Sequence, residues 1–326
     1  MPRFSIIIPN WNGERFLEAC LDSLRKQSFQ DFAAIVVDNA SSDNSLRLLT
    51  DHYPEVAVIR LERNTGFACA VNAGIAASKS PLIALLNNDT ETDPEWLASL
   101  DSAAKSHPEA AFFASKMLDF KSRQIIDSCG NGMSWSGKAY KIGEGETDGE
   151  AWNQKRFVFG ACAGAAAYRA ELFEKIGPFD ETFVTYLEDV DIDFRAQLAG
   201  FRCLFVPEAR VYHIGSATSG KGSKFGFRMG VKNHFHLIAK NYPARFLWRS
   251  IGKLVYAELR LIAAAIRDGY LAAYLEGAWA AARESGHAMQ ERRQIQSARQ
   301  ASDIYLQELI LPTFPFTKIT QALRGR

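Results

Sequence analysis

The sequence lacks a long hydrophobic run. No stretch of its 326 residues reaches the ~18 consecutive apolar residues that a membrane-spanning helix needs. The first five residues lead directly into an apolar segment and are too short and wrongly flanked for a signal peptide. We therefore expect a cytoplasmic protein without a spanning helix.

Cysteine and net charge are also scarce. The five cysteines lie at positions 20, 69, 129, 162 and 203, an odd number without the spacing of a zinc site, which indicates reduced thiols. Lys and Arg number 38 against 37 Asp and Glu, so the basic excess of a nucleic-acid-binding protein is missing. Gly66 and Gly74 are eight positions apart, which does not match the dinucleotide-binding fingerprint and disfavours a dehydrogenase.

The first 90 residues contain a regular alternation of two kinds of segment. Short apolar runs typical of strands alternate with segments whose apolar residues recur at helical spacing. Short connections between such segments are typical of a parallel sheet that helices cover on both faces. We expect strands at residues 4–9, 32–37, 56–61 and 82–86, and helices at residues 14–27, 45–53 and 64–77.

The fourth predicted strand ends in a distinctive polar group. Residues 82–86 are all apolar, and Asn87, Asn88 and Asp89 follow at once. The carboxyl end of a buried parallel strand lies where α/β sheets bind ligands. The alternative is that Asp89 begins the next helix, but residues 93–95 suit that role better. We therefore expect Asp89 to bind a divalent cation that holds a diphosphate.

The other predicted strands also end in polar or aromatic residues, and such ends share one edge of a parallel sheet. Together they offer an aromatic face, a carboxylate, amides and a cation, which a nucleotide needs for its base, ribose and diphosphate. We expect a nucleotide site formed by Pro9, Asn10, Trp11, Asp38, Arg63, Asn64 and Asn88.

From residue 110 onward the alternation breaks down. Residues 121–154 are polar and rich in glycine, which predicts loops and one candidate hairpin over the site. Residues 160–167 carry only small side chains, which let either a ligand approach the backbone or a helix pack tightly on the sheet. Residues 201–206 and 211–213 are expected as two short strands. Residues 219–226 are a basic, glycine-rich loop, either a lid over phosphates or a linker.

Four acidic residues gather within positions 188–193. Acids favour a helix N-terminus, which explains Asp191 and Asp193, and Asp191 is spaced to pair with Arg195. The first two acids of the group precede the secure helical pattern and need another explanation.

Those two acids are Glu188 and Asp189, which follow Tyr186. Paired carboxylates can hold one member at a raised pKa, ready to accept a proton.

His213, at the end of a later predicted strand, has two interpretations. A histidine there is more often structural, but beside a bound cation it is a candidate third ligand.

The C-terminal part differs in composition from the body. Residues 241–326 contain 12 Lys and Arg against 7 Asp and Glu, whereas residues 1–240 contain 26 against 30. Apolar residues recur at helical spacing in this part, which indicates amphipathic helices. Such basic helices suit the surface of an anionic membrane, and they equally suit a helical cap or a homodimer interface. We expect two domains, residues 1–240 and 241–326.

Six motifs resemble those of family 2 inverting glycosyltransferases with the GT-A fold, of the rhamnosyltransferase-like kind that builds bacterial surface polysaccharides. They are SIIIPNWN (5–12), VVDNASSD (36–43), NTGFACAVNAG (64–74), LNNDT (86–90), YLEDVDI (186–192) and VYH (211–213). The resemblance covers about residues 3–240 and does not identify the sugar.

The resemblance implies roles for the matching positions. The implied nucleotide-binding residues are Pro9, Asn10, Trp11, Asp38, Arg63, Asn64, Gly66 and Asn88. Asp89 stands in the place of the last Asp of the family's Asp-x-Asp motif and is implied to bind Mg²⁺ or Mn²⁺, with His213 as a further ligand. Asn87 stands where the first Asp often does, so one carboxylate is missing.

Catalysis and acceptor binding are assigned in the same way. The resemblance implies Asp189 as the general base, with Glu188 beside it, and an acceptor site against Gly164 and Tyr186. It implies transfer of a sugar, with rhamnose as the candidate, from a dTDP or UDP donor to a glycan or lipid-linked acceptor at the inner face of the membrane. Two alternatives stay open: a non-catalytic nucleotide- or carbohydrate-binding protein of this fold, and a nucleotidyltransferase, which would release pyrophosphate.

Overall fold

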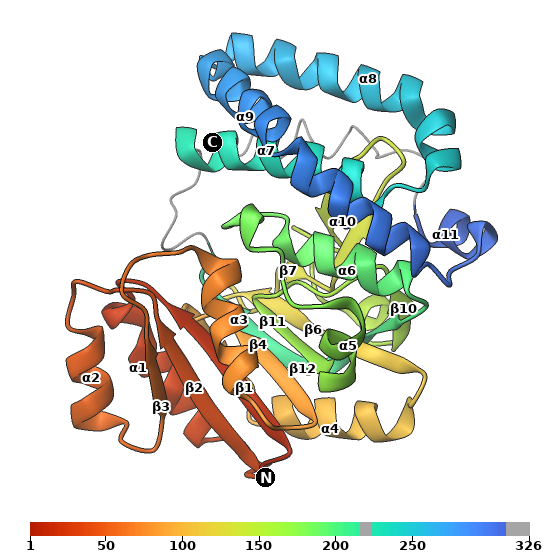
Figure 1. The fold of residues 1–326 in the computed structure, drawn as a ribbon. Helices are drawn as coiled ribbons and strands as arrows, with labels where there is room; N and C mark the ends of the chain where they lie inside the picture. The colour runs from red at the N-terminus through yellow and green to blue at the C-terminus, as the bar shows by residue number, and fades with distance from the viewer. Residues whose placement is uncertain (216–222, 311–326) are drawn as a thin grey trace.

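The computed structural model describes residues 1–215 and 223–310 and consists of a large mixed sheet, helices on both of its faces, and a group of helices at one end (Figure 1). The strands are β1 (Phe4–Asn10), β2 (Phe32–Asp38), β3 (Ala57–Arg60), β4 (Leu82–Leu86), β5 (Thr90–Thr92), β6 (Ala110–Asp119), β7 (Ile126–Ser128), β8 (Asn131–Met133), β9 (Ala139–Lys141), β10 (Arg156–Val158), β11 (Ala165–Arg169) and β12 (Arg202–His213). The helices are α1 (Glu14–Arg25), α2 (Ser45–His52), α3 (Phe67–Ala77), α4 (Trp96–Ser106), α5 (Ala170–Ile176), α6 (Glu188–Leu198), α7 (Lys224–Asn241), α8 (Ala244–Arg267), α9 (Leu271–Arg283), α10 (Ser285–Ser297) and α11 (Asp303–Leu309), with short 3₁₀ helices at Glu150–Trp152 and Glu181–Phe183.

The order of strands across the large sheet is β10-β12-β6-β11-β4-β1-β2-β3. Strands β4, β1, β2 and β3 are parallel neighbours, which confirms the predicted alternation of strand and helix. Strand β11 is antiparallel to both β4 and β6, and β6 is parallel to β12. The second half of the sheet is therefore mixed, and β11 joins it to the parallel half.

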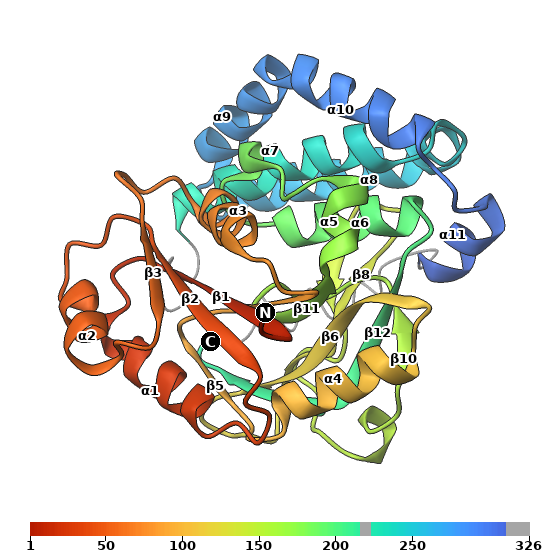
Figure 2. The ribbon, with the colours of Figure 1, turned by 60° about the horizontal axis from the view of Figure 1, so that its bottom comes forward.

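The apolar residues of the central strands alternate between two cores. Ile6 and Ile8 of β1 pack in the core beneath α1 and α4, whereas Ile7 packs in the core beneath α3, α5 and α6. Figure 2 shows these two sets of helices on opposite faces of the sheet. Because both faces are covered, β4 is buried along its whole length, as its uninterrupted apolar sequence predicts.

The structure differs from the prediction at residues 201–213 and shows a hairpin within residues 121–154. Residues 201–213 were expected as two short strands around Pro207, but they form the single long strand β12, with an irregular register between Val206 and Arg210. The chain bends at this point without leaving the sheet. Within the glycine-rich residues 121–154, strands β8 and β9 pair as a two-stranded hairpin.

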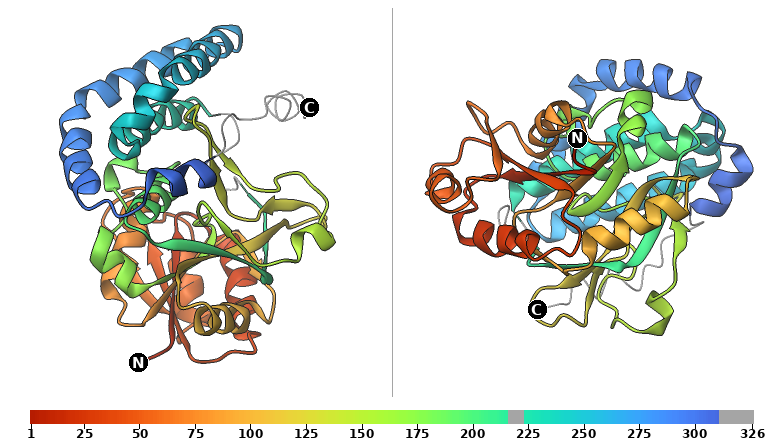
Figure 3. Two further views of the ribbon diagram at one scale, coloured as in Figure 1. Left: turned by 90° about the vertical axis from the view of Figure 1, so that its right-hand side faces the viewer. Right: turned by 90° about the horizontal axis from the view of Figure 1, so that it is seen from below.

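Helices α7 to α11 lie together at one end of the molecule, away from the N-terminus (Figures 1 and 3). Helix α7 packs against α6 of the body and against α9 and α10. Tyr242, between α7 and α8, is fully buried, and its hydroxyl donates to the carbonyl of Ser134 in the β8–β9 hairpin at 2.7 Å. The predicted boundary between the two domains, at residue 240, falls at the end of α7, and the division into two domains stays a prediction. Residues 311–326 of the predicted second domain lie outside the described residues.

Two further expectations concern this end of the molecule. Of the predicted lid at residues 219–226, residues 219–222 lie outside the described part of the chain, and residues 224–226 are the first turn of α7 rather than a loop. Ser223 caps that turn by accepting from the backbone N–H of Gly226 at 3.0 Å. Within the described residues, no helix combines the length and the apolarity that crossing a membrane requires.

Candidate active site

The carboxyl ends of β1, β2 and β4 are joined by a network of buried side chains. The register pairs Asn10 with Asp38 across β1 and β2. Asn10 Nδ2 donates to Asp38 Oδ1 at 3.1 Å, and Asn88 Nδ2 donates to Asn10 Oδ1 at 2.7 Å. All three residues are buried. The structure therefore brings together three predicted nucleotide-binding residues from positions as far apart as 10 and 88.

Two glycines allow the chain to approach this region closely. A Cβ on Gly13 would lie 2.1 Å from Asn88 Nδ2 and 2.2 Å from Asn10 Oδ1, so the network leaves no room for a side chain there. Gly66 has φ +88°, and a Cβ on it would lie 2.6 Å from the carbonyl oxygen of Val184. Gly66 is thus the point where the nucleotide region contacts the segment that leads to Glu188.

The remaining predicted nucleotide-binding residues lie around this network. Trp11 is 40% exposed, and Pro9 is half-buried beside it. Arg63 and Asn64 are exposed, and Asn64 Oδ1 accepts from Asn39 Nδ2 at 3.0 Å. An exposed indole and an exposed guanidinium at the rim suit a planar base and an anion.

Glu188 and Asp189 begin helix α6, and the residues before them have unusual backbone conformations. Val184, Tyr186 and Leu187 all have positive φ, between 61° and 70°. Such angles cost roughly 1–3 kcal/mol for each non-glycine residue and persist only where the surroundings impose them. Asn233 of α7 helps to impose them here, since its Nδ2 donates to the carbonyls of residues 183, 185 and 186.

The two carboxyl groups of this pair differ in environment. Glu188 is buried with 8% of its surface exposed, and its Oε2 has no hydrogen-bond partner among the described residues. Burial, together with the charge of Asp189, raises the pKa of Glu188 to about 8, so Glu188 keeps its proton at neutral pH. Asp189 is partly exposed and accepts from N–H donors of Asn131, Ala163 and Val190 at 3.1, 3.3 and 2.8 Å. Such donors suit a carboxylate that carries charge.

Asn131 of β8 also donates a hydrogen bond to a second carboxyl group, that of Asp193. Its Nδ2 lies 2.9 Å from Asp193 Oδ2, and Asp193 Oδ1 accepts from the backbone N–H of Ala161 at 3.0 Å. Burial and the nearby Asp189 raise the pKa of Asp193 well above its usual value. A Cβ on Gly160 would lie 1.9 Å from Asp193 Oδ2, which explains by helix packing at least one of the small residues at 160–167.

The predicted metal ligands Asp89 and His213 lie side by side. His213 Nε2 is 3.4 Å from Asp89 Oδ1, and Nδ1 is 2.9 Å from Asp127 Oδ2. Lys141 Nζ lies 2.9 Å from Asp127 Oδ1. Burial opposes a charge on the imidazole, but the hydrogen bonds with Asp127 and Asp89 outweigh it and raise the pKa of His213 to about 9.

The donor set of this group fits a divalent cation only with help from a ligand. Among residues 1–215 and 223–310, no group of three or more His, Cys, Asp and Glu is arranged to hold a metal ion. Asp89 and His213 offer two donors, whereas Asp127 binds the opposite imidazole nitrogen and orients the ring, as outer carboxylates do in metal sites. A diphosphate would have to complete the coordination.

The metal-binding candidates and the base meet along residues 162–164. The backbone N–H of Asn87, two positions before Asp89, donates to Gly164 O at 2.9 Å, and the N–H of Ala163 donates to Asp189. Burial raises the pKa of the Cys162 thiol to about 12, and the charges of Lys141, Asp189 and Asp127 all act on it. Residues 163 and 164 therefore contact Asp189 directly and the chain next to Asp89 through Asn87.

The two predicted acceptor residues, Gly164 and Tyr186, differ in burial and in their contacts. Gly164 is buried, and a Cβ on it would lie 2.9 Å from Met117 Cε and 3.3 Å from Asn87 Nδ2. Tyr186 is partly exposed, and its ring lies against Gly226 at the start of α7. No contact tests whether either residue meets an acceptor, so both roles stay predictions.

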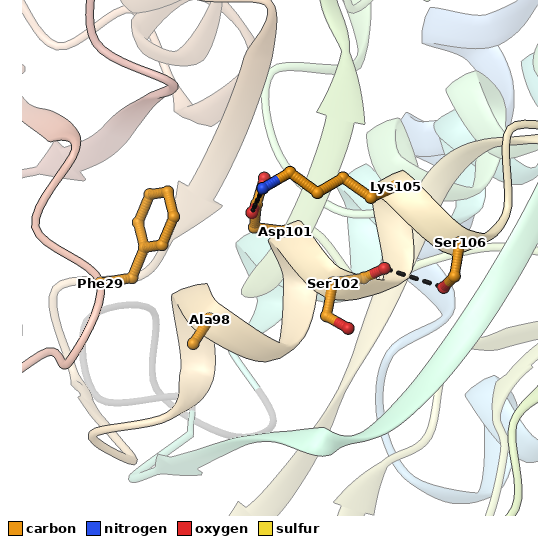
Figure 4. A pocket seen from close by; sticks show the side chains of 6 residues that line it. All are labelled: Phe29, Ala98, Asp101, Ser102, Lys105 and Ser106. Carbon is orange, nitrogen blue, oxygen red and sulfur yellow. Dashed lines mark hydrogen bonds and ion pairs between the residues drawn. The ribbon is translucent and has the colours of Figure 1, made fainter.

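Figure 4 shows a surface depression along α4. It is lined by Phe29, Ala98, Asp101, Ser102, Lys105 and Ser106. Its one carboxylate, Asp101, is paired with Arg3 at 2.8 Å and with Lys105 at 2.6 Å, which is typical of a structural ion pair. The depression contains none of the candidate catalytic residues.

The residues of the site that were not predicted from the sequence include Gly13, Asp127, Asn131 and Lys141. The sequence carried a weak signal for Gly13, which follows the first strand closely. The other three lie in the glycine-rich segment, where neither periodicity nor a motif separates them from ordinary loop residues. Their roles depend on the hairpin register and on the return of β12.

Comparison with known proteins decides the family. The family model "Glycosyl transferase family 2" matches residues 5–177, which is more than half of the chain. The chain belongs to glycosyl transferase family 2. An N-acetylglucosaminyl-diphospho-decaprenol L-rhamnosyltransferase of Mycobacterium tuberculosis is 26% identical over 232 residues, 63% of this chain and 74% of that protein. The O-antigen biosynthesis protein RfbC of Myxococcus xanthus is 27% identical over 227 residues, 67% of this chain.

Several relatives of this family 2 chain are much longer than it is. The matched region spans 18% of RfbC and 25% of the uncharacterised protein y4gI of Sinorhizobium fredii, which is 28% identical over 231 residues. The activities of such relatives are therefore carried to this chain only as proposals.

Solved structures show the same fold. GalNAc-T7 with UDP, GalNAc and Mn²⁺ superimposes with a TM-score of 0.60 at 19% identity, over 74% of this chain and 48% of that one. Residues 1–349 of Staphylococcus aureus TarS, solved with UDP-GlcNAc, give a TM-score of 0.56 at 16% identity over 91% of both chains. The predicted GT-A fold and family membership are thus confirmed.

Proposed function

We propose that this family 2 chain is an inverting glycosyltransferase that moves a sugar from a nucleoside-diphosphate donor to a glycan or lipid-linked acceptor in the synthesis of a cell-surface polysaccharide. The observation that supports this reaction is that residues 163 and 164 hydrogen-bond to Asp189 and to Asn87, which lies two positions before Asp89 of the Asp89–His213 pair. A displacement needs a proton acceptor and a positive charge near the leaving group. Asp189 would supply the first, and a cation held by Asp89 and His213 would supply the second.

In the proposed reaction Asp189 accepts the proton of an acceptor hydroxyl. The hydroxyl oxygen forms a bond to the anomeric carbon while the bond from that carbon to the donor diphosphate breaks, which inverts the configuration. Asn131, Ala163 and Val190 hold the carboxylate of Asp189 in place through their N–H groups. Glu188, which keeps its proton, adds no second negative charge beside the base.

Asp89 and His213 are the residues that would hold Mg²⁺ or Mn²⁺. A cation bound there would supply positive charge to the departing diphosphate. The GalNAc-T7 and Pyrobaculum calidifontis mannosyltransferase structures, which share the fold, were solved with Mn²⁺, and the latter also with GDP-Man. The nucleoside is proposed to bind against the polar side chains of Asn10, Asp38 and Asn88, which are linked by hydrogen bonds through Asn10.

The acceptor is proposed to lie at an anionic membrane surface. Helix α8 carries Arg245, Arg249, Lys253, Arg260 and Arg267 against the single acid Glu258. Its exposed large apolar residues include Trp248, Ile251, Val255 and Leu259, which are three or four positions apart, and Ile266 two turns later; Trp248 is 79% exposed and Ile266 60%. A basic helix with such a stripe suits the interface of an anionic bilayer. The acceptor named for the M. tuberculosis relative, a diphospho-decaprenol, is also a lipid.

A product assay tests the reaction. The chain is incubated with a panel of dTDP-, UDP- and GDP-sugars, beginning with dTDP-rhamnose, with Mn²⁺ and a polyprenyl-diphosphate-linked sugar. Release of nucleoside diphosphate with glycosylated lipid supports the transferase, and release of pyrophosphate indicates a nucleotidyltransferase instead. Asp189→Asn should reduce turnover by about 10³-fold or more while donor binding persists. Wild-type turnover in that variant would disprove the mechanism.

A further inference from the structure

The β8–β9 hairpin presents polar side chains to both halves of the site. Its register places Asn131 directly opposite Lys141. Asn131, which is only 4% exposed, donates to Asp189 at 3.1 Å. Lys141 donates to both oxygens of Asp127, at 2.9 and 3.0 Å, and Asp127 in turn orients His213. One residue of this facing pair, Asn131, therefore contacts the base Asp189. The other, Lys141, contacts Asp127, the carboxylate that orients His213.

We propose that this pair, Asn131 facing Lys141, fixes the separation between the base Asp189 and the Asp89–His213 pair. Asn131 and Lys141 are then positioning residues of the transfer reaction. The inference rests on the proposed function and adds two residues that the family motifs do not contain.

The physical reason is the stiffness of an antiparallel pair. Facing residues of two hydrogen-bonded strands are held about 4.5–5.5 Å apart between Cα atoms, and this separation changes little without breaking the pairing. An inline displacement needs the proton acceptor and the charge-stabilising group at a set distance on opposite sides of the sugar. A misplacement of about 1 Å can cost on the order of 10²-fold in rate.

Contacts at both ends of the hairpin hold this pair in place. At its base, Asn131 N donates to Gly160 O at 2.8 Å, and Gly160 N donates back to Asn131 O at 3.1 Å. At its tip, the ring of Trp135 stacks on Phe246 of α8 with centroids 4.3 Å apart. The hairpin is therefore anchored to Gly160, close in sequence to residues 162–164, and, through its tip, to the helical end of the molecule.

A purely structural role for these side chains makes different predictions. Asn131 also contacts the buried Asp193, so its loss is expected to lower stability in either case. A structural role alone would reduce the folded fraction and leave the turnover of the folded enzyme and its ligand affinities unchanged. A positioning role would change the turnover number in one variant and the affinity for Mn²⁺ and UDP in the other.

The experiment compares Asn131→Ala and Lys141→Met with Ser136→Ala, which removes a buried hydroxyl whose one hydrogen-bond partner among residues 1–215 and 223–310 is Ser134 of the same hairpin. Fractions folded are matched by circular dichroism, donor kcat and KM are measured, and binding of UDP with MnCl₂ is followed by calorimetry and by the electron paramagnetic resonance of free Mn²⁺. We expect Asn131→Ala to lower kcat about 10- to 100-fold with donor KM within about threefold. Lys141→Met should weaken Mn²⁺ binding in the presence of UDP by about 10-fold or more, with Lys141→Arg restoring most of it.

The outcomes distinguish a failure of the positioning role from a failure of the proposed transferase function. If Asp189→Asn is inactive while Asn131→Ala and Lys141→Met both match Ser136→Ala, the positioning role is wrong and the transferase stands. If Asp189→Asn retains wild-type turnover, the proposed function itself is wrong. Should Asn131→Ala fail to fold, Lys141→Met decides, because the Lys141 side chain is 32% exposed and its loss leaves Asp127 reachable by solvent.

Discussion

Nε2 of His213 lies 3.4 Å from Oδ1 of Asp89, although the two residues are separated by more than 120 positions in the chain. Strand β12 returns antiparallel to the short strand β5 with His213 opposite Thr90, the residue that follows Asp89. The backbone N–H of Ile214 also donates to Asp89 O at 3.0 Å. This pairing of strands places the two side chains together.

Replacing His213 tests whether this pair binds a cation. His213→Ala should weaken Mn²⁺ binding in the presence of UDP by roughly 10- to 100-fold and lower turnover at limiting Mn²⁺, because one of the two protein ligands is lost. Calorimetric titration of MnCl₂ into the UDP-bound protein measures the change. His107→Ala, which removes a partly exposed imidazole that pairs with Glu109, is the control. Equal Mn²⁺ affinity in both variants would refute a ligand role for His213.

The raised pKa of Glu188 predicts a specific dependence of stability on pH. Between pH 4.5, the ordinary value, and about pH 8, the folded state binds more protons at Glu188 than the unfolded state does. The contribution of Glu188 to the free energy of unfolding is therefore complete below this window and falls as pH rises through it, by at most about 1.4 kcal/mol per pH unit. Urea unfolding at pH 5, 6, 7 and 8 should show a shallower decline for Glu188→Gln than for wild type.

An exposed acid provides the control for that experiment. Glu171→Gln, on the exposed side of α5, should leave the wild-type pH slope intact. A wild-type slope in Glu188→Gln would show that Glu188 ionises normally, and the division of charge between Glu188 and Asp189 would then be wrong.

Gly66 links the nucleotide region to the segment before the base, so a methyl group there should damage both stability and activity. Gly66→Ala forces a φ of +88° on alanine and places its Cβ 2.6 Å from Val184 O. We expect a loss of more than about 1 kcal/mol in the free energy of unfolding and a lower kcat. Gly230→Ala in α7 is the matched control, since no atom of the described part of the chain lies within 4 Å of where its Cβ would be, and it should stabilise by about 0.5–1 kcal/mol. Equal stability of the two variants would contradict the contact.

The exposed stripe of α8 predicts binding to anionic vesicles. Trp248→Ser with Leu259→Ser should reduce flotation with phosphatidylglycerol vesicles, and Arg249→Ala with Lys253→Ala should reduce it by about 5-fold for each charge, since each basic residue contributes about 1 kcal/mol at an anionic surface. Ile304→Ser, which alters an apolar residue of α11 that is 70% exposed, serves as control. Wild-type flotation in all variants would remove the membrane proposal, and a change of oligomeric state in the α8 variants would favour a dimer interface.

The first half of the fold was predictable because its signals are local. The apolar runs at β1, β2 and β4 and the helices between them are read from consecutive residues, and their predicted bounds agree with the structure to within three residues. Asp191 likewise pairs with Arg195 one helical turn away, at 2.9 Å, as the spacing predicts. Pro207 predicts a break between two strands, but the pairing of β12 with β6 continues past it. No pattern in the neighbouring residues indicates this long-range pairing.

The sequence by itself determined the alternating strands, the family, and the residues at strand ends, because periodicity and motifs are properties of neighbouring positions. Tertiary structure alone decided that Asn131 contacts Asp189 and that Asp127 orients His213. Both contacts join segments that are dozens of positions apart, and they depend on strand register and on the return path of β12. These quantities are set by the packing of the whole chain, and no stretch of residues encodes them alone.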